Sequence, residues 1–187
     1  MPKKSSPGMV QVYTGNGKGK TTSALGVGLR AAGHGLEVVM ICFMKAKLAM
    51  RGEEEEINYG EFGSTDRIPH FTIIPVGRET FVDKENPDPI DIQMAQDGLK
   101  LAQSYIHERK CDVLILDEIN VAVEWNLISL EAQLDLIRSK PKEMELIMTG
   151  RYAAKEVIDA ADLVTEMREV KHYYTARKTL ARKGFEF

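Results

Sequence analysis

The chain has 187 residues, of which 43% are hydrophobic and 28% charged, a composition that suits one globular domain over residues 1–187 with a substantial core. Its net charge of −3 at pH 7 argues against a nucleic-acid partner, because nucleic-acid-binding surfaces depend on clustered Lys and Arg. No apolar run is long enough to cross a bilayer, and the polar N-terminal segment lacks the apolar core of a signal peptide, so we expect a cytoplasmic protein without a membrane partner.

The stretch from Thr14 to Thr22 joins a strand-forming run to a helix-forming run and is rich in glycine and lysine. Its sequence is typical of a phosphate-binding loop, Gly15-Asn16-Gly17-Lys18-Gly19-Lys20-Thr21-Thr22. The glycines allow successive backbone N–H groups to turn towards an anion at the helix N-terminus. Lys20 adds a full positive charge, and the Thr21 hydroxyl is suited to a phosphate-bound Mg²⁺. Thr14 stands where the usual motif has its first glycine, so the loop is effectively one residue shorter.

The rest of the chain alternates strands with helices, which predicts a mostly parallel sheet covered on both faces. Apolar runs predict strands at 9–13, 37–43, 71–76, 113–116, 145–148 and 163–165. Helices are expected after the phosphate loop and at 91–109, 129–138 and 153–161. Loop residues dominate from 46 to 69, and a basic tail begins at 171. Cys42 and Cys111 lie in or beside strands, which favours reduced structural thiols.

Helical spacing also predicts which side chains are buried. In the first helix, Leu25, Leu29 and Ala32 fall on one face, and Gly26 and Gly28 would allow close packing. In the helix at 91–109, the expected buried stripe is Ile92, Ala95, Leu99, Ala102 and Ile106.

The apolar strand at 113–116 ends in Asp117-Glu118. This arrangement resembles a Walker B strand, whose carboxylates reach the Mg²⁺ beside a phosphate loop. An acidic cap for the following helical segment is the alternative, and the phosphate loop favours the metal-binding interpretation. Lys45 and Arg151 also follow strands, so we expect them at the same edge of the sheet. Arg151 could bind phosphate through two parallel hydrogen bonds, and a surface ion pair is its alternative role.

Further motifs, Arg30-Ala31-Ala32-Gly33-His34-Gly35, Thr149-Gly150-Arg151 and Lys171-His172, complete a resemblance to the ATP:corrinoid adenosyltransferases, a phosphate-loop (P-loop) family, over nearly the whole chain. The resemblance implies a three-layer, RecA-like α/β fold and a homodimer. It implies transfer of the 5′-deoxyadenosyl group of ATP to the cobalt(I) of a reduced corrinoid such as cobalamin, cobinamide or cobyrinic acid a,c-diamide, with release of triphosphate. The reaction would belong to cobalamin biosynthesis or salvage, and a reductase such as a flavoprotein would supply the electrons.

By matching positions, the resemblance also implies roles for single residues. The loop from Gly15 to Thr22 would bind the triphosphate, and Lys20 and Arg151 would act on it during the reaction. Thr21 and Glu118, with Asp117 beside them, would hold Mg²⁺ or Mn²⁺. Arg30 would contact the nucleotide, and His172 would help to shape the site.

The family's corrinoid-facing loop usually carries Phe-x-Trp, which is absent between Gly77 and Phe81. Phe81 is therefore the candidate for excluding the lower axial ligand of the corrinoid, and loop packing is its alternative role. Two other functional classes stay open, a P-loop kinase or ATPase that transfers the γ-phosphoryl group and a regulatory module switched by ATP. The products separate these classes, because adenosyl transfer releases triphosphate and phosphoryl transfer releases ADP.

Overall fold

The computed structural model describes residues 7–51 and 55–187, with only the backbone described at 48–51 and 55–58. Its principal strands are β1 (Val10–Thr14), β2 (Val38–Phe43), β5 (Phe71–Val76), β6 (Val113–Asp117), β7 (Glu145–Thr149) and β8 (Leu163–Glu166). Within the described residues they form one parallel sheet in the order β5-β2-β6-β7-β1-β8. The predicted strands are thereby confirmed.

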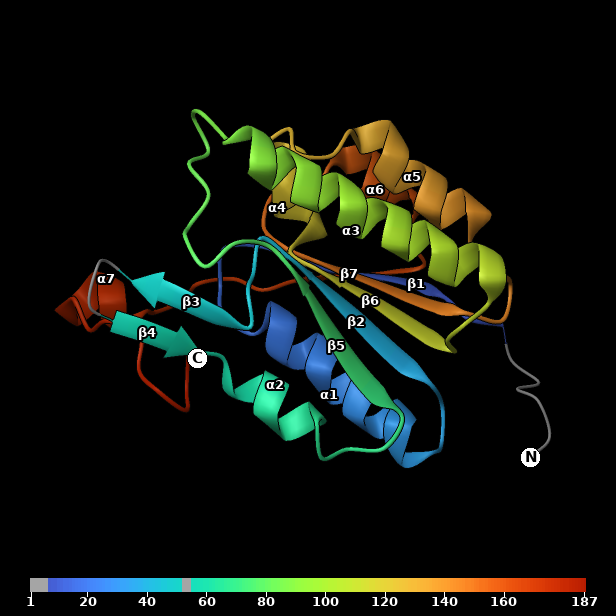
Figure 1. Ribbon diagram of the computed structural model, residues 1–187, viewed down its shortest axis with the longest axis horizontal. Helices are drawn as coiled ribbons and strands as arrows, with labels where there is room; N and C mark the ends of the chain where they lie inside the picture. The colour runs from blue at the N-terminus through green and yellow to red at the C-terminus, as the bar shows by residue number, and fades with distance from the viewer. Residues whose placement is uncertain (1–6, 52–54) are drawn as a thin grey trace.

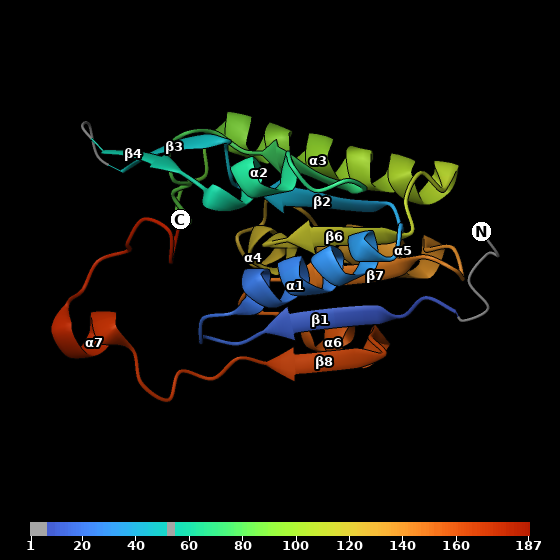
Figure 2. The same cartoon turned by 90° about the horizontal axis from the view of Figure 1, so that it is seen from below.

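Helices cover both faces of this sheet (Figures 1 and 2). On one face lie α1 (Lys20–Gly33) and α2 (Gly60–Thr65). On the other lie α3 (Pro89–Glu108), α4 (Ile119–Glu124), α5 (Leu130–Ser139) and α6 (Lys155–Ala160). The predicted three-layer α/β fold is confirmed.

Two apolar clusters hold the layers together, because successive side chains of a strand point to opposite faces. In β6, Leu114 and Leu116 pack into the cluster beneath α3 to α6, whereas Val113 and Ile115 pack into the cluster beneath α1. Every residue of β2 is buried, as expected for a strand covered on both faces. These buried strands form a rigid platform for the loops at their carboxyl ends.

The buried face of α1 matches the predicted one only in part: Ala32 is buried, Leu25 packs against the core and Gly28 allows close packing, whereas Leu29 and Gly26 do not face the sheet. Leu29 is 53% exposed, and no atom lies near enough to Gly26 for that glycine to serve close packing. The buried positions are Lys20, Ala24, Gly28 and Ala32, which repeat every fourth residue. A Cβ atom on Gly28 would lie 2.7 Å from the ring of Phe71. The helix therefore packs so closely on the sheet at Gly28 that only a small residue fits there, and Leu25 packs against the core from the side.

The stretch from 46 to 69 is more ordered than its loop-like composition predicts. It forms an antiparallel hairpin of β3 (Leu48–Arg51) and β4 (Glu55–Asn58), and then α2, whereas residues 52–54 lie outside the described part. The basic tail likewise contains a short helix, α7 (Tyr173–Arg177). These elements are too short to show a helical or strand period in the sequence.

The helices at 91–109 and 129–138 are confirmed as α3 and α5. Ser129 caps α5, where its hydroxyl accepts a hydrogen bond from the N–H of Ala132 at 3.2 Å. The stripe of α3 is buried except for Ile92, which is 38% exposed. Cys42 and Cys111 are buried free thiols, and burial raises the pKa of Cys111 to about 12. In the part of the chain that the structure describes, no helix has the length and apolar character needed to span a membrane.

Candidate active site

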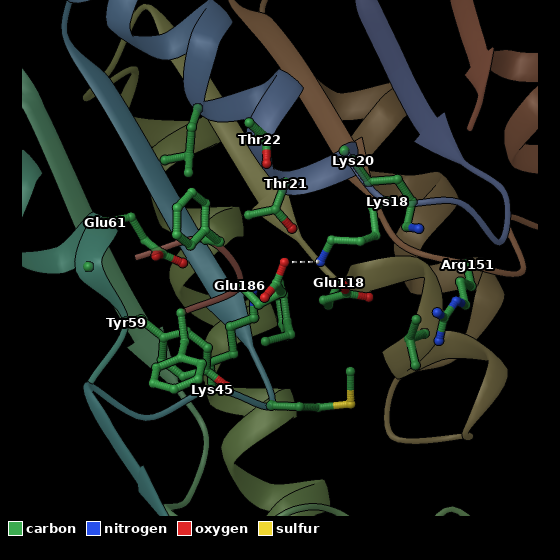
Figure 3. Close-up of a pocket in the computed structure, with 18 of the residues that line it drawn as sticks. Lys18, Lys20, Thr21, Thr22, Lys45, Tyr59, Glu61, Glu118, Arg151 and Glu186 are labelled. Atoms are coloured by element: carbon green, nitrogen blue, oxygen red, sulfur yellow. Dashed lines mark ion pairs between the residues drawn. The ribbon is translucent and has the colours of Figure 1, made fainter. Parts of the chain in front are cut away.

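A cavity of about 800 Å³ lies at the carboxyl ends of the strands, beside the N-terminus of α1 (Figure 3). Its lining includes Gly17 to Thr22, the β2 end from Phe43 to Lys45, Glu118, and Arg151. These residues follow β1, β2, β6 and β7, so the sheet brings together the predicted loop, lysine, carboxylate and arginine. Ligands of parallel α/β sheets bind at this edge, because loops and helix N-termini converge there.

Lys20 is the first residue of α1 and is buried at the base of the phosphate loop. Its Nζ donates hydrogen bonds to the carbonyl oxygens of Gly15 and Gly17, each at 2.8 Å. Burial lowers the pKa of Lys20, Glu118 opposes this effect, and Arg151 adds to it. The ammonium group is thus held inside the loop, next to the cavity.

The outer side of the phosphate loop rests against the chain that leaves β8. The N–H of Gly17 donates to the carbonyl oxygen of Met167 at 2.7 Å. Gly15 has a φ of 94°, and a Cβ atom there would lie 2.5 Å from the same carbonyl oxygen. The expectation that successive N–H groups face an anion therefore fails for Gly17. This loop is built with glycine partly because another segment of backbone touches it.

Thr14, the departure from the usual motif, has a structural role of its own. It is buried at the end of β1, and its hydroxyl accepts a hydrogen bond from the N–H of Ala153 at 3.3 Å. A glycine could not make this bond. The N–H of Gly150 also donates to the carbonyl oxygen of Tyr13 at 3.2 Å. Two hydrogen bonds thus join the end of β1, just before the phosphate loop, to the turn that carries Arg151.

A buried amide pair supports the Arg151 turn from behind. The side chain of Gln133 donates to Asn120 Oδ1 at 2.8 Å, and Asn120 Nδ2 donates to the Gly150 carbonyl at 3.3 Å. Both amides are about 1% exposed, so these bonds are not exchanged with water. The turn is fixed, and the exposed guanidinium of Arg151 extends from it to the cavity wall.

Asp117 is fully buried and both of its carboxylate oxygens have protein partners. Lys45 Nζ lies 2.6 Å from Oδ2, and the Thr149 hydroxyl donates to Oδ1 at 2.6 Å. Burial alone would lower the pKa of Lys45, but the charge of Asp117, its hydrogen bond to Lys45 and the neighbouring Cys42 and Glu118 together outweigh it, so the net pKa is raised. The Thr149 oxygen also accepts from the N–H of Glu118 at 3.0 Å. Asp117 thereby ties together the ends of β2, β6 and β7.

Glu118, the next residue, has a left-handed backbone with a φ of 62° and lines the cavity. Burial and the neighbouring Asp117 raise its pKa, against the opposing effect of Lys45 and Lys20. Thr21 lines the same cavity (Figure 3). No group of three or more His, Cys, Asp or Glu side chains among the described residues could enclose a metal ion. One carboxylate and one hydroxyl fit Mg²⁺, which keeps several waters and shares the phosphates of a substrate.

Phe81 lies at the rim of the cavity, where it is 66% exposed. Its loop is anchored at the base, because Arg78 Nε donates to Asp91 Oδ1 at 2.7 Å. The Cβ position of Gly77 is only 2.4 Å from the backbone nitrogen of Lys45, so the loop leaves β5 in close contact with the end of β2. Phe81 is thus presented to the cavity by a fixed support.

Gly15, Asn16 and Asp117 do not line this cavity themselves but lie close in sequence to residues that do. Two further predicted residues, Arg30 and His172, do not line it either. Arg30 lies in the last turn of α1, about 15 Å along the helix from Lys20 at 1.5 Å per residue. His172 is the N-cap of α7, where its Nδ1 accepts a hydrogen bond from the N–H of Tyr174 at 3.0 Å. A contact of either residue with nucleotide stays a prediction.

Other lining residues escaped the sequence analysis. They come from α2 and the residue before it, from the loop between β5 and α3, and from the C-terminal segment, and include Tyr59, Glu61, Val82, Phe185 and Glu186. Lys45 Nζ lies 5.7 Å from the centre of the Tyr59 ring, which places α2 beside the buried ion pair. No spacing or motif in the sequence indicates that these segments meet at one site. Only the folded structure brings them together.

A parallel sheet with a phosphate loop at one strand end and a carboxylate at another defines a P-loop nucleotide-binding protein. The structure is similar to that of the KaiC-like protein PH0186 from Pyrococcus horikoshii OT3, with a TM-score of 0.51 over 88% of this chain and 74% of that chain. At 13% identity this similarity concerns the fold, and it confirms the RecA-like P-loop prediction.

The family is defined by sequence. Residues 6–187 match the family model of the ATP:corrinoid adenosyltransferases BtuR/CobO/CobP, and the chain belongs to that family. The corrinoid adenosyltransferase of Pseudomonas aeruginosa is 35% identical over 180 residues, which cover 96% of this chain and 84% of the relative. Corrinoid adenosyltransferase CobA of Salmonella typhimurium is 30% identical over 169 residues, covering 90% and 81%.

Proposed function

We propose that this protein transfers the 5′-deoxyadenosyl group of ATP to the cobalt of a reduced corrinoid in cobalamin biosynthesis or salvage. Cobalt(I) supplies the electron pair of the new Co–C bond, the C5′–O bond of ATP breaks, and triphosphate leaves with the electrons of that bond. Family membership supports the reaction, and one observation carries it to this chain. A single cavity is lined both by the phosphate loop and by the exposed ring of Phe81.

The phosphate loop and Arg151 act on the leaving triphosphate. Lys18, Lys20 and Arg151 all line the cavity and bring three positive charges to it. A pair of unit charges about 4 Å apart interacts by roughly 4 kcal/mol at an effective dielectric constant near 20. These positive charges stabilise the charge that develops on the leaving group, which accelerates its departure.

Thr21 and Glu118 would hold Mg²⁺, or Mn²⁺, against the triphosphate. When bound, the metal neutralises phosphate charge. Because both oxygens of Asp117 already have partners, we assign it a role behind Glu118. Through Thr149 it fixes the backbone N–H of Glu118, and so sets the position from which that carboxylate reaches the cavity.

Phe81 would provide an apolar surface beneath the corrinoid. A donor on the lower axial face of cobalt favours the higher oxidation state, and an apolar wall in its place favours the four-coordinate form that is easier to reduce. The exposed side chain of Phe81, on an anchored loop at the cavity rim, is placed for such a contact.

The products of an anaerobic reaction test this function. The protein, ATP, Mg²⁺ and chemically reduced cobalamin should yield adenosylcobalamin and triphosphate in equal amounts. Release of ADP would identify a kinase or ATPase, and tight ATP binding without any product would identify a switch module. Either result would contradict the proposal.

The assembly and its surroundings are part of the same proposal. We expect one catalytic domain per chain, a homodimer in the cytoplasm, and a flavoprotein or similar reductase as the electron donor. Light scattering at several protein concentrations would measure the mass of the assembly. Replacement of the chemical reductant by a reduced flavoprotein would show whether such a donor sustains turnover.

A further inference from the structure

The C-terminal segment returns to the cavity after leaving the sheet. From β8 at one edge of the sheet the chain passes through α7, and its end lies on the side of α2 and β4 (Figure 2). Residues 184–187 then contribute to the cavity lining, opposite the phosphate loop. The segment therefore brings side chains to a ligand that the motifs of the N-terminal half are expected to bind.

Glu186 is the charged residue of this segment, and its carboxylate is firmly held. Arg182 donates to it from the backbone N–H at 2.7 Å, from Nε at 3.2 Å and from Nη2 at 3.3 Å. The Tyr173 hydroxyl donates a further hydrogen bond. Arg182 and then Tyr173 lower the pKa of Glu186 to about 2, so the group is ionised at neutral pH. Its side chain is only 10% exposed, which makes it a fixed negative charge in the cavity wall.

Lys18 of the phosphate loop faces this charge. Its Nζ lies 3.8 Å from Glu186 Oε1, and the two side chains point towards each other across the cavity (Figure 3). The lysine is the mobile partner, because its side chain is 49% exposed and ends a flexible four-carbon stem. At 3.8 Å the contact is an ion pair and not a hydrogen bond, so the N–H groups of Lys18 remain available to another acceptor.

We propose that Glu186 is a positioning residue for Lys18. Its negative charge attracts the ammonium group of Lys18 into the cavity before nucleotide binds. The side chain of Lys18 then loses less conformational freedom when it contacts the triphosphate. Arg182 and Tyr173 hold the carboxylate of Glu186 in place. The carboxylate therefore cannot move with Lys18 into the position that a phosphate group would occupy. The inference rests on the proposed function in one respect, that triphosphate is the ligand of the phosphate loop.

The test measures binding of inorganic triphosphate with Mg²⁺ by calorimetry. Glu186→Gln keeps the shape of the side chain and removes its charge, and we expect about five-fold weaker binding, the upper range for a partly exposed ion pair. Glu169→Gln is the matched control in the same segment, because the carboxylate of Glu169 bonds to Thr175. Its affinity should equal that of the parent protein.

A double-mutant cycle separates positioning from a general structural role. Lys18→Gln should weaken binding by itself, and adding Glu186→Gln to that variant should change nothing further. An equal effect of Glu186→Gln in both backgrounds would overturn the inference. Tighter binding by Glu186→Gln would also overturn it, and would show that the carboxylate blocks the site.

Tyr173→Phe provides a second route, since it loosens Glu186 without altering any charge. We expect about two-fold weaker triphosphate binding, and unchanged binding would count against the inference. The readout does not involve corrinoid. A protein that binds triphosphate as described and transfers no adenosyl group would contradict the proposed function alone.

Discussion

The phosphate end of the cavity and its exposed rim are built in different ways. The phosphate end rests on buried groups at strand ends, such as Lys20, Asp117 and Thr149, each fixed by hydrogen bonds. The rim consists of large exposed rings, with Phe81 at 66%, Tyr152 at 53% and Phe185 at 76% exposure. Fixed charges suit a leaving group whose geometry is the same in every cycle. Exposed rings suit a large, flat substrate that must enter and leave.

The largest effect is expected from Lys20→Ala, which removes the buried charge at the phosphate end. Turnover should fall by about 10²–10³-fold or more, the usual loss when a group that stabilises transition-state charge is deleted. The rate of triphosphate release at saturating ATP measures it. Lys100→Ala, which changes an exposed pair with Asp97, is the control. A near-normal rate and ATP affinity in Lys20→Ala would refute the assignment of the phosphate loop.

Lys45→Ala tests whether the phosphate end is rigid because of its buried ion pair. The substitution leaves the Asp117 charge buried without its partner, and we expect the free energy of unfolding to fall by about 3–5 kcal/mol. Urea unfolding measures the change. The neighbouring Lys47→Ala should cost less than about 0.5 kcal/mol, since its pair with Asp66 is exposed. A combined Lys45→Met and Asp117→Asn variant should regain part of the loss.

Glu118→Gln and Thr21→Ala should each raise the Mg²⁺ concentration needed for half-maximal activity, by roughly tenfold for the carboxylate and less for the hydroxyl. Metal titrations at fixed ATP measure this. Asp117→Asn should act mainly on stability, because its partners are Lys45 and Thr149. An equal metal requirement in Asp117→Asn and Glu118→Gln, without loss of stability, would make Asp117 a direct ligand.

The smallest effect on stability is expected from a substitution at the rim of the cavity. Phe81→Ala should change the free energy of unfolding by less than about 0.5 kcal/mol, because the side chain is mostly exposed. Its ATP affinity should match that of the parent. Electron paramagnetic resonance with ATP and cob(II)alamin should nevertheless lose most of the four-coordinate cobalt(II) signal. A signal as strong as that of the parent would transfer the role to another side chain.

The difference between the phosphate end and the rim also explains which parts of the site could be predicted from the sequence. The phosphate loop and the Asp117-Glu118 strand end were predicted because neighbouring residues encode the strand, turn and helix together. The rim was largely missed, because Phe81, Tyr152 and Phe185 come from segments far apart in sequence. Only Phe81 was identified there, and only through a resemblance.

Two smaller outcomes have physical causes of the same kind. Leu29 was assigned to the buried face of α1 by its apolar character, but the close approach at Gly28 admits only small residues there. Thr14 was visible as a departure from the usual motif, yet its bond to Ala153 depends on a turn at the far end of the chain. At Leu29 the apolar character of the side chain did not predict burial, because α1 lies unusually close to the sheet at Gly28.

The contact between Gly17 and Met167 has a consequence for the order in which the protein is made. The phosphate loop gains its outer support from a carbonyl group 150 residues later, and β1 pairs with β7 and β8 in the sheet. During synthesis the loop is translated well before β7, β8 and Met167. A nascent chain that has not yet reached Met167 therefore lacks a finished nucleotide site, and ATP can stabilise the completed fold but not its earlier intermediates.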